Sequence, residues 1–313
     1  MSRILAEASL PATVGEWVQG WIGGRESLVS LVVSWKGSIE LCVPDAGDIL
    51  SVCGEKSLRA FGKAREIFAG TPGTFPEESA INVINPLPTS KGLATSTMDV
   101  AGTFAACAAH AGAALSEERL FSLCASVEPS DGIMFGGLAL VDHIKGELIE
   151  RLPGPPQMTL VAVIPRRTLD TDAYRRDVSA LEALRGHSRE HERAYDILKR
   201  ALAAGDAALA ASAATLSAEI QQGVMPREEW DALMEARRLT GALGVAVAHS
   251  GTASGLLYEP TNEFSAALAE KWLADTLRTK ESGVAIRRTS VCGGGFLSGV
   301  TNPRVIETAD VRQ

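Results

Sequence analysis

The sequence predicts an α+β protein built from two halves, and three observations support this prediction. Strand-like runs gather in the first third of the chain, whereas helical patterns dominate the rest. Pro153-Gly-Pro-Pro156 blocks regular structure and separates the two halves. A chain of 313 residues has room for one large domain or two medium-sized ones. We therefore expect an N-terminal domain over residues 1–155 and a C-terminal α+β domain over residues 156–313, with a small sheet backed by helices.

The N-terminal half is predicted to begin with a hairpin. Residues 28–35 and 38–43 are strand-like, and Lys36-Gly37 lies between them as the turn. Four glycines are expected to interrupt the segment before residue 28, namely Gly15, Gly20, Gly23 and Gly24. Apolar spacing then predicts a helix over 57–68 with Ser57 as its N-cap, a strand over 80–84, an Ala-rich buried helix over 93–115, a helix over 116–127, an irregular loop over 127–137 and a strand over 138–142.

The C-terminal half combines strands with a series of helices. Strands are predicted over 158–164 and 284–288, and helices over 179–203, 206–222, 227–243 and 262–280. Residues 244–258 are typical of a strand, a tight Gly/Ser turn and a second strand. The final residues are polar and are expected to form a loose tail.

The composition argues against several function classes. A formal net charge of −8 has the wrong sign for binding a nucleic-acid backbone, so we expect no nucleic-acid partner. The apolar run over 28–35 is too short to span a bilayer, and the first residues lack a signal-peptide pattern. We therefore expect a cytoplasmic protein without a membrane partner. The five cysteines form no Cys-x-x-Cys pair, which favours buried thiols over a zinc site.

The segment Pro88-Thr-Ser-Lys-Gly-Leu-Ala-Thr-Ser-Thr97 is the most informative in the chain. It places small and hydroxylated residues where the Ala-rich helix begins, and a helix N-terminus offers unpaired N–H groups to an anion. Gly92 would let the backbone approach a phosphate, and Lys91 would add positive charge. A simple helix cap is the alternative. The segment differs from a Walker A loop, which requires Gly-x-x-x-x-Gly-Lys-Ser/Thr.

Two further segments could carry chemistry. Glu128-Pro-Ser-Asp131 offers two carboxylates, one to bind a metal ion and one to orient a hydroxyl, as phosphoryl transfer requires. An aspartate in a turn before a glycine is the structural alternative. His249-Ser-Gly-Thr-Ala-Ser-Gly255 is either a second backbone cradle for phosphate or substrate, or a hairpin turn. The pair His187 and His191 lies in polar sequence, which favours a solvated helix face over a metal site.

Taken together, these segments resemble the GHMP kinase superfamily, which includes galactokinase, homoserine kinase and mevalonate kinase. The family's central loop reads roughly Pro-x-x-x-Gly-Leu-Gly/Ala-Ser-Ser-x, and residues 88–97 match it, with Ser90 in place of a frequent glycine. The family's third motif, a Gly-rich turn between strands, is similar to residues 249–255. The resemblance implies a two-domain fold, with a mixed α/β N-terminal domain that carries the phosphate loop and a ferredoxin-like α+β C-terminal domain.

Within the superfamily, the chain is most similar to the L-threonine kinase branch that is linked to cobalamin synthesis. Three segments carry the similarity: residues 15–22, 91–99 and 127–131. The resemblance implies an enzyme that uses ATP and Mg²⁺ to convert L-threonine to O-phospho-L-threonine. It also implies that Ser96 ligates Mg²⁺ together with Glu128 or Asp131, that Asp131 orients the acceptor hydroxyl, and that Lys91 assists catalysis.

The predicted contacts divide into two sets. The nucleotide phosphates are expected to be bound by Pro88, Ser90, Lys91, Gly92, Leu93, Ala94, Thr95, Ser96 and Thr97. The amino-acid substrate is expected to contact Glu16, Gln19, Ser130, His249, Ser250 and Gly251. Its carboxylate requires a cation in the pocket, for which Arg287 or Arg288 is a candidate, although the sequence favours a solvated strand end for each. Homoserine kinase, a kinase of another small alcohol and a catalytically silent nucleotide-binding protein remain alternatives, and a homodimer is left open.

Overall fold

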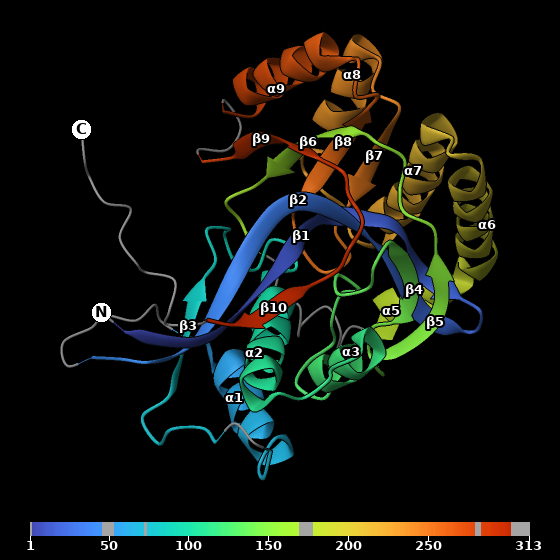
Figure 1. The fold of residues 1–313 in the computed structure, drawn as a ribbon. Helices are drawn as coiled ribbons and strands as arrows, with labels where there is room; N and C mark the ends of the chain where they lie inside the picture. Colours follow the sequence, from blue (N-terminus) through green and yellow to red (C-terminus); the bar gives the residue numbers. More distant parts are fainter. Residues whose placement is uncertain (1, 46–52, 72–73, 169–177, 279–282, 302–313) are drawn as a thin grey trace, which may run out of the picture.

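Two antiparallel sheets and the helices packed against them make up the fold of the computed structural model (Figure 1). The structure describes residues 2–45, 53–71, 74–168, 178–278 and 283–301. The first sheet has the order β10-β1-β2-β4-β5, with β3 paired to β2, and the second has the order β7-β8-β6-β9. This arrangement confirms the predicted α+β class with a small second sheet backed by helices.

The first sheet is built around one long hairpin. Its strands are β1 (Arg3–Ile22) and β2 (Arg25–Val43), and Gly23-Gly24 forms the turn. The predicted turn at Lys36-Gly37 is therefore wrong. β2 continues through these two residues, which pair with Leu10 and Pro11, and an irregularity just before them shifts the register from Pro11–Lys36 to Ala12–Val33. The irregularity lies within a single strand where the sequence suggested two.

Gly15 and Gly20 do not interrupt β1, contrary to the prediction. They make room for other parts of the chain instead. A Cβ atom at Gly15 would lie 2.8 Å from the backbone nitrogen of Val247, and one at Gly20 would lie 2.4 Å from the ring of His191. Both glycines thus allow close packing of the second half of the chain on β1.

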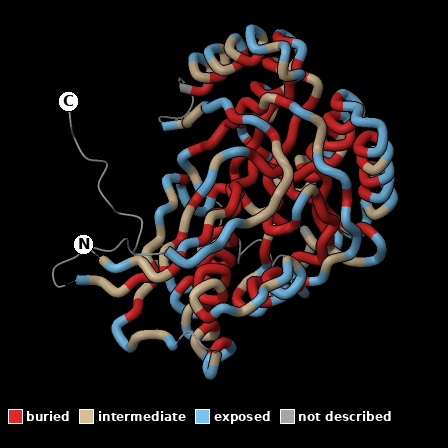
Figure 2. The backbone as a smooth tube through the Cα atoms, in the orientation of Figure 1, coloured by how far each residue is buried: buried red, intermediate tan, exposed pale blue. Residues whose placement is uncertain are grey.

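The remaining N-terminal elements largely confirm the predictions. They are α1 (Glu55–Ile67), β3 (Ala80–Ile84), α2 (Thr95–Ala111), α3 (Glu117–Ala125) and β4 (Leu138–Asp142), followed by the unpredicted β5 (Glu147–Leu152). The N-cap of α1 is Gly54 and not Ser57 as predicted, whereas the Ser116 hydroxyl caps α3. Helix α2 is buried along most of its length, as its alanines predicted, and Figure 2 shows this interior together with β1 and β2.

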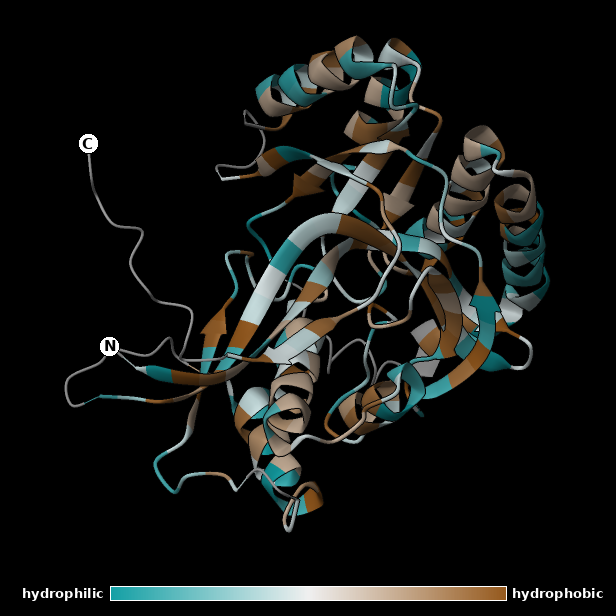
Figure 3. Ribbon diagram, viewed as in Figure 1, coloured by the Kyte–Doolittle hydropathy of each residue, from teal (hydrophilic) through white to brown (hydrophobic). Residues whose placement is uncertain are grey.

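The C-terminal half contains the second sheet and five described helices. Its strands are β6 (Thr159–Ile164), β7 (Gly244–Val247), β8 (Ser254–Tyr258) and β9 (Ala285–Ser290). The helices are α5 (Val178–Gly186), α6 (Ser188–Ala204), α7 (Ala207–Val224), α8 (Trp230–Thr240) and α9 (Glu263–Arg278). The single helix predicted over 179–203 is wrong, because His187 separates α5 from α6. Helix α6 is hydrophilic on its outer face (Figure 3) and packs against β1 with its inner face.

The C-terminal half also completes the first sheet. Strand β10 (Leu297–Val300) pairs with β1. The segment before β10 contacts Gly137, because the Gly294 amide donates a hydrogen bond to the Gly137 carbonyl. The predicted tail over the final residues lies outside the described part of the chain. The proposed boundary near residue 155 stays a prediction, since one hydrophobic core includes residues of both halves. Within the described ranges, every helix falls short of the length and apolarity that crossing a bilayer requires.

Candidate active site

The loop before α2 adopts an unusual backbone. Ser90, Gly92 and Ala94 have φ angles of +59°, +77° and +56°, and Ala94 is the N-cap of α2. L-residues rarely adopt positive φ, so Ser90 and Ala94 hold this conformation at an energetic cost. Positive φ at every second residue of a loop is compatible with a backbone concavity whose N–H groups bind an anion. The N-terminus of α2 adds its own N–H groups and its dipole.

The loop is held against the turn between β7 and β8. The Ala253 amide donates to the Lys91 carbonyl oxygen at 2.8 Å, and a Cβ atom at Gly251 would lie 2.3 Å from the Gly92 nitrogen. From β1, the Thr13 hydroxyl donates to the Gly92 carbonyl at 3.3 Å. The loop is thus fixed by both halves of the chain.

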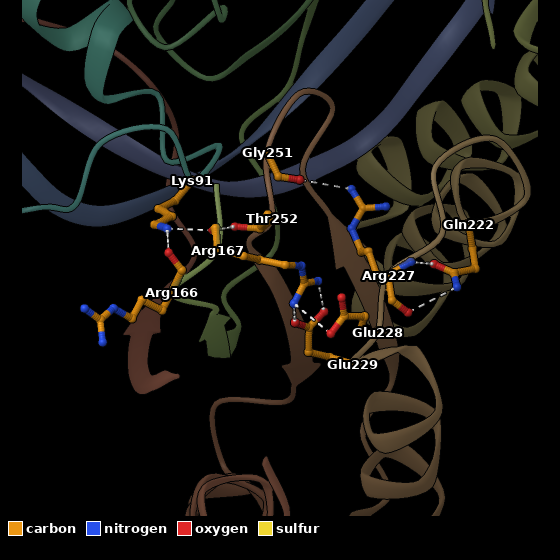
Figure 4. Close-up of polar contacts among 9 residues, drawn as sticks. All are labelled: Lys91, Arg166, Arg167, Gln222, Arg227, Glu228, Glu229, Gly251 and Thr252. Carbon is orange, nitrogen blue, oxygen red and sulfur yellow. Dashed lines mark hydrogen bonds and ion pairs between the residues drawn. The ribbon is translucent and has the colours of Figure 1, made fainter. Parts of the chain in front are cut away.

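Lys91 is buried, and its ammonium is directed away from the helix N-terminus (Figure 4). It donates to the carbonyl oxygens of Arg166 and Arg167, just beyond β6, the latter at 2.6 Å. On the other side of the turn, the buried Arg227 guanidinium donates to the carbonyls of Ala248 and Gly251. These two cations brace the loop and the turn from opposite sides.

A cavity of about 740 Å³ opens in front of the loop. Four segments line it: the start of α1, the loop with the first turns of α2, the loop before β4, and the turn after β7. The lining residues are Gly54, Glu55, Lys56, Ser57, Arg59, Thr89, Ser90, Gly92, Leu93, Ala94, Thr95, Ser96, Thr97, Asp99, Val127, Glu128, Pro129, Asp131 and Ser250.

Two hydroxyls of α2 contact the two acids of the loop before β4. The Ser96 hydroxyl donates to the Glu128 carboxylate, which also pairs with Lys56 of α1. The Thr97 hydroxyl lies 3.3 Å from a carboxylate oxygen of Asp131 and accepts from the Asp131 amide at 3.1 Å. Helix α2 therefore fixes both carboxylates at the cavity, although they lie more than 30 residues away in the sequence.

A third carboxylate, that of Asp99, lies one turn further along α2. Burial raises its pKa to about 6, the Asn85 amide that donates to it at 3.0 Å opposes this rise, and the charge of Glu128 adds to it. An acid whose pKa rises because of burial and a like charge is typical of a functional site.

Glu16, Gln19 and His249 lie together behind the turn. The His249 Nδ1 atom is 2.9 Å from Gln19 Oε1, and the Gln19 amide donates to the Val247 carbonyl at 3.0 Å. Glu16 is 3% exposed. Burial raises the pKa of Glu16 well above its usual range, and the nearby charge of Asp131 raises it further.

The structure brings most of the predicted nucleotide and metal residues to the cavity. Ser90, Gly92 to Thr97, Glu128, Asp131 and Ser250 line it. Six other predicted residues are not among the lining residues: Pro88, Glu16, Gln19, Ser130, His249 and Gly251. Lys91 also does not line it. Arg287 and Arg288 are exposed, and Arg288 pairs with Glu270, as expected for a solvated strand end.

Sequence reasoning missed Lys56, Arg59 and Asp99, all of which line the cavity. Lys56 and Arg59 lie on α1, whose charged face has the pattern of any surface helix, so no local signal distinguishes them. Asp99 carries a signal, because an acid on an otherwise apolar Ala-rich helix is unusual. The solvated face predicted for His191 is wrong, since the ring is buried and accepts from the Trp21 amide at 3.0 Å.

Comparisons with known proteins give a consistent result. Residues 57–137 match the model of the GHMP kinases N terminal domain. The chain is 33% identical to the L-threonine kinase of Citrobacter freundii over 256 residues, which cover 82% of this chain and 87% of that protein.

Solved structures show the same fold at lower identity. A homoserine kinase structure from Listeria monocytogenes, described as putative in function, superposes with a TM-score of 0.64 at 15% identity, covering 94% of this chain and 98% of that one. A structure described as MDDEF in complex with MVAPP, AMPPCP and magnesium has a TM-score of 0.69 at 15% identity, covering 96% and 100% of the two chains. At this identity the likeness shows the fold alone.

Proposed function

This chain belongs to the GHMP kinase family, and from that premise we propose that it transfers the γ-phosphoryl group of ATP to the hydroxyl of L-threonine. The observation that carries the proposal is the convergence of the phosphate loop, Ser96, Glu128 and Asp131 on one cavity. The similarity to an L-threonine kinase over most of both chains supports threonine as the acceptor.

Nucleotide binding is assigned to the loop over residues 88–97. Its concave backbone presents N–H groups to the β- and γ-phosphates, and the α2 dipole stabilises their negative charge. Lys56 and Arg59 line the same cavity and supply the positive charge that phosphates require. In this proposal Lys91 positions the loop through the carbonyls beyond β6.

The residues at the cavity suit a magnesium ion. A serine hydroxyl and carboxylates are hard oxygen ligands, the type that Mg²⁺ prefers. Ser96 and Glu128 are already in contact and would hold the ion. When bound, Mg²⁺ would neutralise charge on the phosphate oxygens. A fold neighbour determined with AMPPCP and magnesium is consistent with this assignment.

Asp131 is proposed to act on the acceptor. The threonine hydroxyl oxygen attacks the γ-phosphorus, the bond to the β–γ bridging oxygen breaks, and the hydroxyl proton passes to the Asp131 carboxylate. Thr97 holds this carboxylate in place through its hydroxyl and through the Asp131 amide. Burial and the charge of Asp131 raise the pKa of Glu16, which favours the uncharged form of this acid next to Asp131. Glu16, Gln19, Ser130 and Ser250 remain the proposed contacts of the amino-acid head group.

Turnover with a panel of acceptors tests the function. Purified protein with ATP and Mg²⁺ would be offered L-threonine, L-serine, L-homoserine, mevalonate and galactose, and the products identified by mass spectrometry. Phosphothreonine as the dominant product supports the proposal. Phosphohomoserine or another phosphate ester as the product would support kinase activity but contradict L-threonine as the acceptor. ATP binding without any turnover would favour a silent nucleotide-binding protein.

The cellular context is proposed on the same resemblance. We expect the phosphothreonine to serve cobalamin synthesis. A strain that lacks the gene should then fail to make cobalamin, and cobinamide or O-phospho-L-threonine derivatives added to the medium should restore its synthesis. Location in the cytoplasm and a homodimer stay predictions, which fractionation and light scattering would test.

A further inference from the structure

A cluster of three metal-binding side chains lies apart from the residues that line the cavity. Glu26 comes from the start of β2, His143 from the turn after β4, and His249 from the turn after β7. One ligand atom from each lies within 4.8 Å of the others. The Glu26 oxygen is 3.1 Å from His249 Nε2 and 3.7 Å from His143 Nε2. The side chains are 11%, 5% and 3% exposed, in the order Glu26, His249 and His143.

The hydrogen bonds of Gln19 determine the tautomer of His249, and therefore whether the ring nitrogen that faces Glu26 is an acceptor. The Gln19 amide nitrogen donates to the Val247 carbonyl, so Gln19 Oε1 must accept from His249 Nδ1–H. In the neutral ring, Nε2 then presents its lone pair to the Glu26 carboxylate. Two acceptor atoms at this distance require a proton or a metal cation between them.

We propose that Glu26, His143 and His249 bind one divalent transition-metal ion, with Zn²⁺ as the best fit. Two imidazoles and one carboxylate form a known zinc ligand set. Zinc–nitrogen bonds of about 2.0–2.1 Å place tetrahedral ligand atoms about 3.3 Å apart, close to the 3.1 Å and 3.7 Å seen here. A zinc-ligating histidine usually donates its other ring N–H to an oxygen of the protein. The Nδ1–H of His249 makes such a hydrogen bond, to the Gln19 amide oxygen.

Two other cations fit less well. A proton shared by Glu26 and His249 accounts for the 3.1 Å separation of these two side chains, but it does not explain why His143 Nε2 also lies 3.7 Å from the same Glu26 oxygen. An ammonium group that donates to all three atoms would hold them about 4.7 Å apart, well above two of the observed separations.

The ion would join three segments that are distant in sequence: the start of β2, the turn after β4 and the turn after β7. The first two segments belong to the first sheet, whereas the third leads from His249 to Gly251, which contacts the phosphate loop at Gly92. We therefore assign the ion the task of holding the β7–β8 turn against the loop, with water at the fourth position that three protein ligands leave open. This role is separate from the proposed magnesium site at Ser96 and Glu128.

Metal content tests the proposal without reference to turnover. The full chain, with any affinity tag removed, would be incubated with ZnCl₂, passed through a desalting column and assayed by elemental analysis. The wild type is expected to retain about one zinc per chain, and the variants His143→Gln and His249→Gln less than about a tenth of that. His187→Gln is the matched control, because His187 is exposed on the surface and should leave zinc retention unchanged. Equal retention by all four proteins would overturn the proposal.

The Co²⁺ form of the wild type provides a second readout that does not depend on the folding of any variant. Nitrogen and oxygen ligands in a tetrahedral site give visible d–d absorption without a thiolate-to-cobalt charge-transfer band. That spectrum, together with a higher unfolding temperature in zinc, supports the site. A thiolate band would place the metal on cysteines and overturn it. Failure to retain any metal, together with a raised KM for L-threonine in His143→Gln, would identify the cluster as an ammonium site instead.

Discussion

Gly251 of the β7–β8 turn packs so closely on Gly92 of the phosphate loop that a Cβ atom at Gly251 would lie 2.3 Å from the Gly92 nitrogen. A Cβ atom at Gly92 would likewise lie 2.3 Å from the Cβ of Ala248. The two glycines allow the second sheet to support the loop that faces the cavity. Gly251, which does not line the nucleotide cavity, therefore helps to position the backbone amides of the loop.

Gly251→Ala should weaken ATP binding. The added methyl group must displace backbone, since the nearest atoms are the Gly92 nitrogen and the Lys91 carbonyl carbon. We expect kcat/KM for ATP to fall by about tenfold or more and the free energy of unfolding to fall by about 1–3 kcal/mol. Gly223→Ala, inside α7 with open space around it, is the control and should leave kcat/KM unchanged. Normal ATP kinetics in Gly251→Ala would contradict this support role.

Ser96→Ala should lower kcat by orders of magnitude and leave the fold intact. The change removes a hydroxyl that contacts Glu128 and, in the proposed function, the magnesium ion. Steady-state kinetics over a range of Mg²⁺ concentrations would measure the loss, and circular dichroism would check the fold. Ser122→Ala on the exposed side of α3 serves as the control. Turnover close to that of the wild type would remove Ser96 from the metal site.

Asp131→Asn should lower kcat by about 10²–10⁴-fold, the range for loss of a positioned base. The amide keeps the size of the side chain and its contact with Thr97, so KM for ATP should change little. Initial rates with saturating L-threonine give the comparison, and Asp196→Asn on the exposed face of α6 is the matched change. A reduction of only a few fold would mean that positioning and charge neutralisation carry the reaction without this acid.

The pKa of Asp99 makes stability depend on pH. Burial raises this pKa from 3.8 to about 6, so the native state holds the proton at pH values where the unfolded chain has lost it. Stability is therefore greatest below pH 4 for this group and falls as pH rises through 6, by up to about 3 kcal/mol at 1.36 kcal/mol per pKa unit. Asp99→Asn should be more stable than the wild type at pH 8 and equal to it near pH 4. Urea denaturation at both values would reveal the difference, and a constant difference would contradict it.

Lys91→Met should destabilise the protein. The ammonium donates to two backbone carbonyls beyond β6, and methionine would leave both without this donor. We expect a loss of about 2–4 kcal/mol in the free energy of unfolding, with activity falling because the loop is displaced. Lys63→Met removes a similar bond at the surface, to the Ser126 carbonyl, and should cost far less. Loss of kcat at unchanged stability would instead support the catalytic role first predicted for Lys91.

Local sequence patterns predicted the helices of the phosphate half well. Helix α2 was recognisable from its alanines and α3 from its Ser116 cap, because both signals act within a few residues. The predicted hairpin turn at Lys36-Gly37 is wrong because β1 runs alongside β2 for its whole length and pairs with both residues, through Pro11 and Leu10. Strand β5 escaped prediction because most of its residues are exposed and its pattern is not apolar.

For the site, the sequence alone determined the hydroxyl-rich loop, the two acids of residues 128–131 and, through resemblance, the family. These features depend on residue type at short spacing, which the chain displays directly. Tertiary structure decided that Lys91 braces the loop, that Lys56 and Arg59 face the cavity, and that Glu26, His143 and His249 meet. Each of these depends on packing between segments more than 30 residues apart, where the direction of a side chain is set by its neighbours in space and not by its neighbours in sequence.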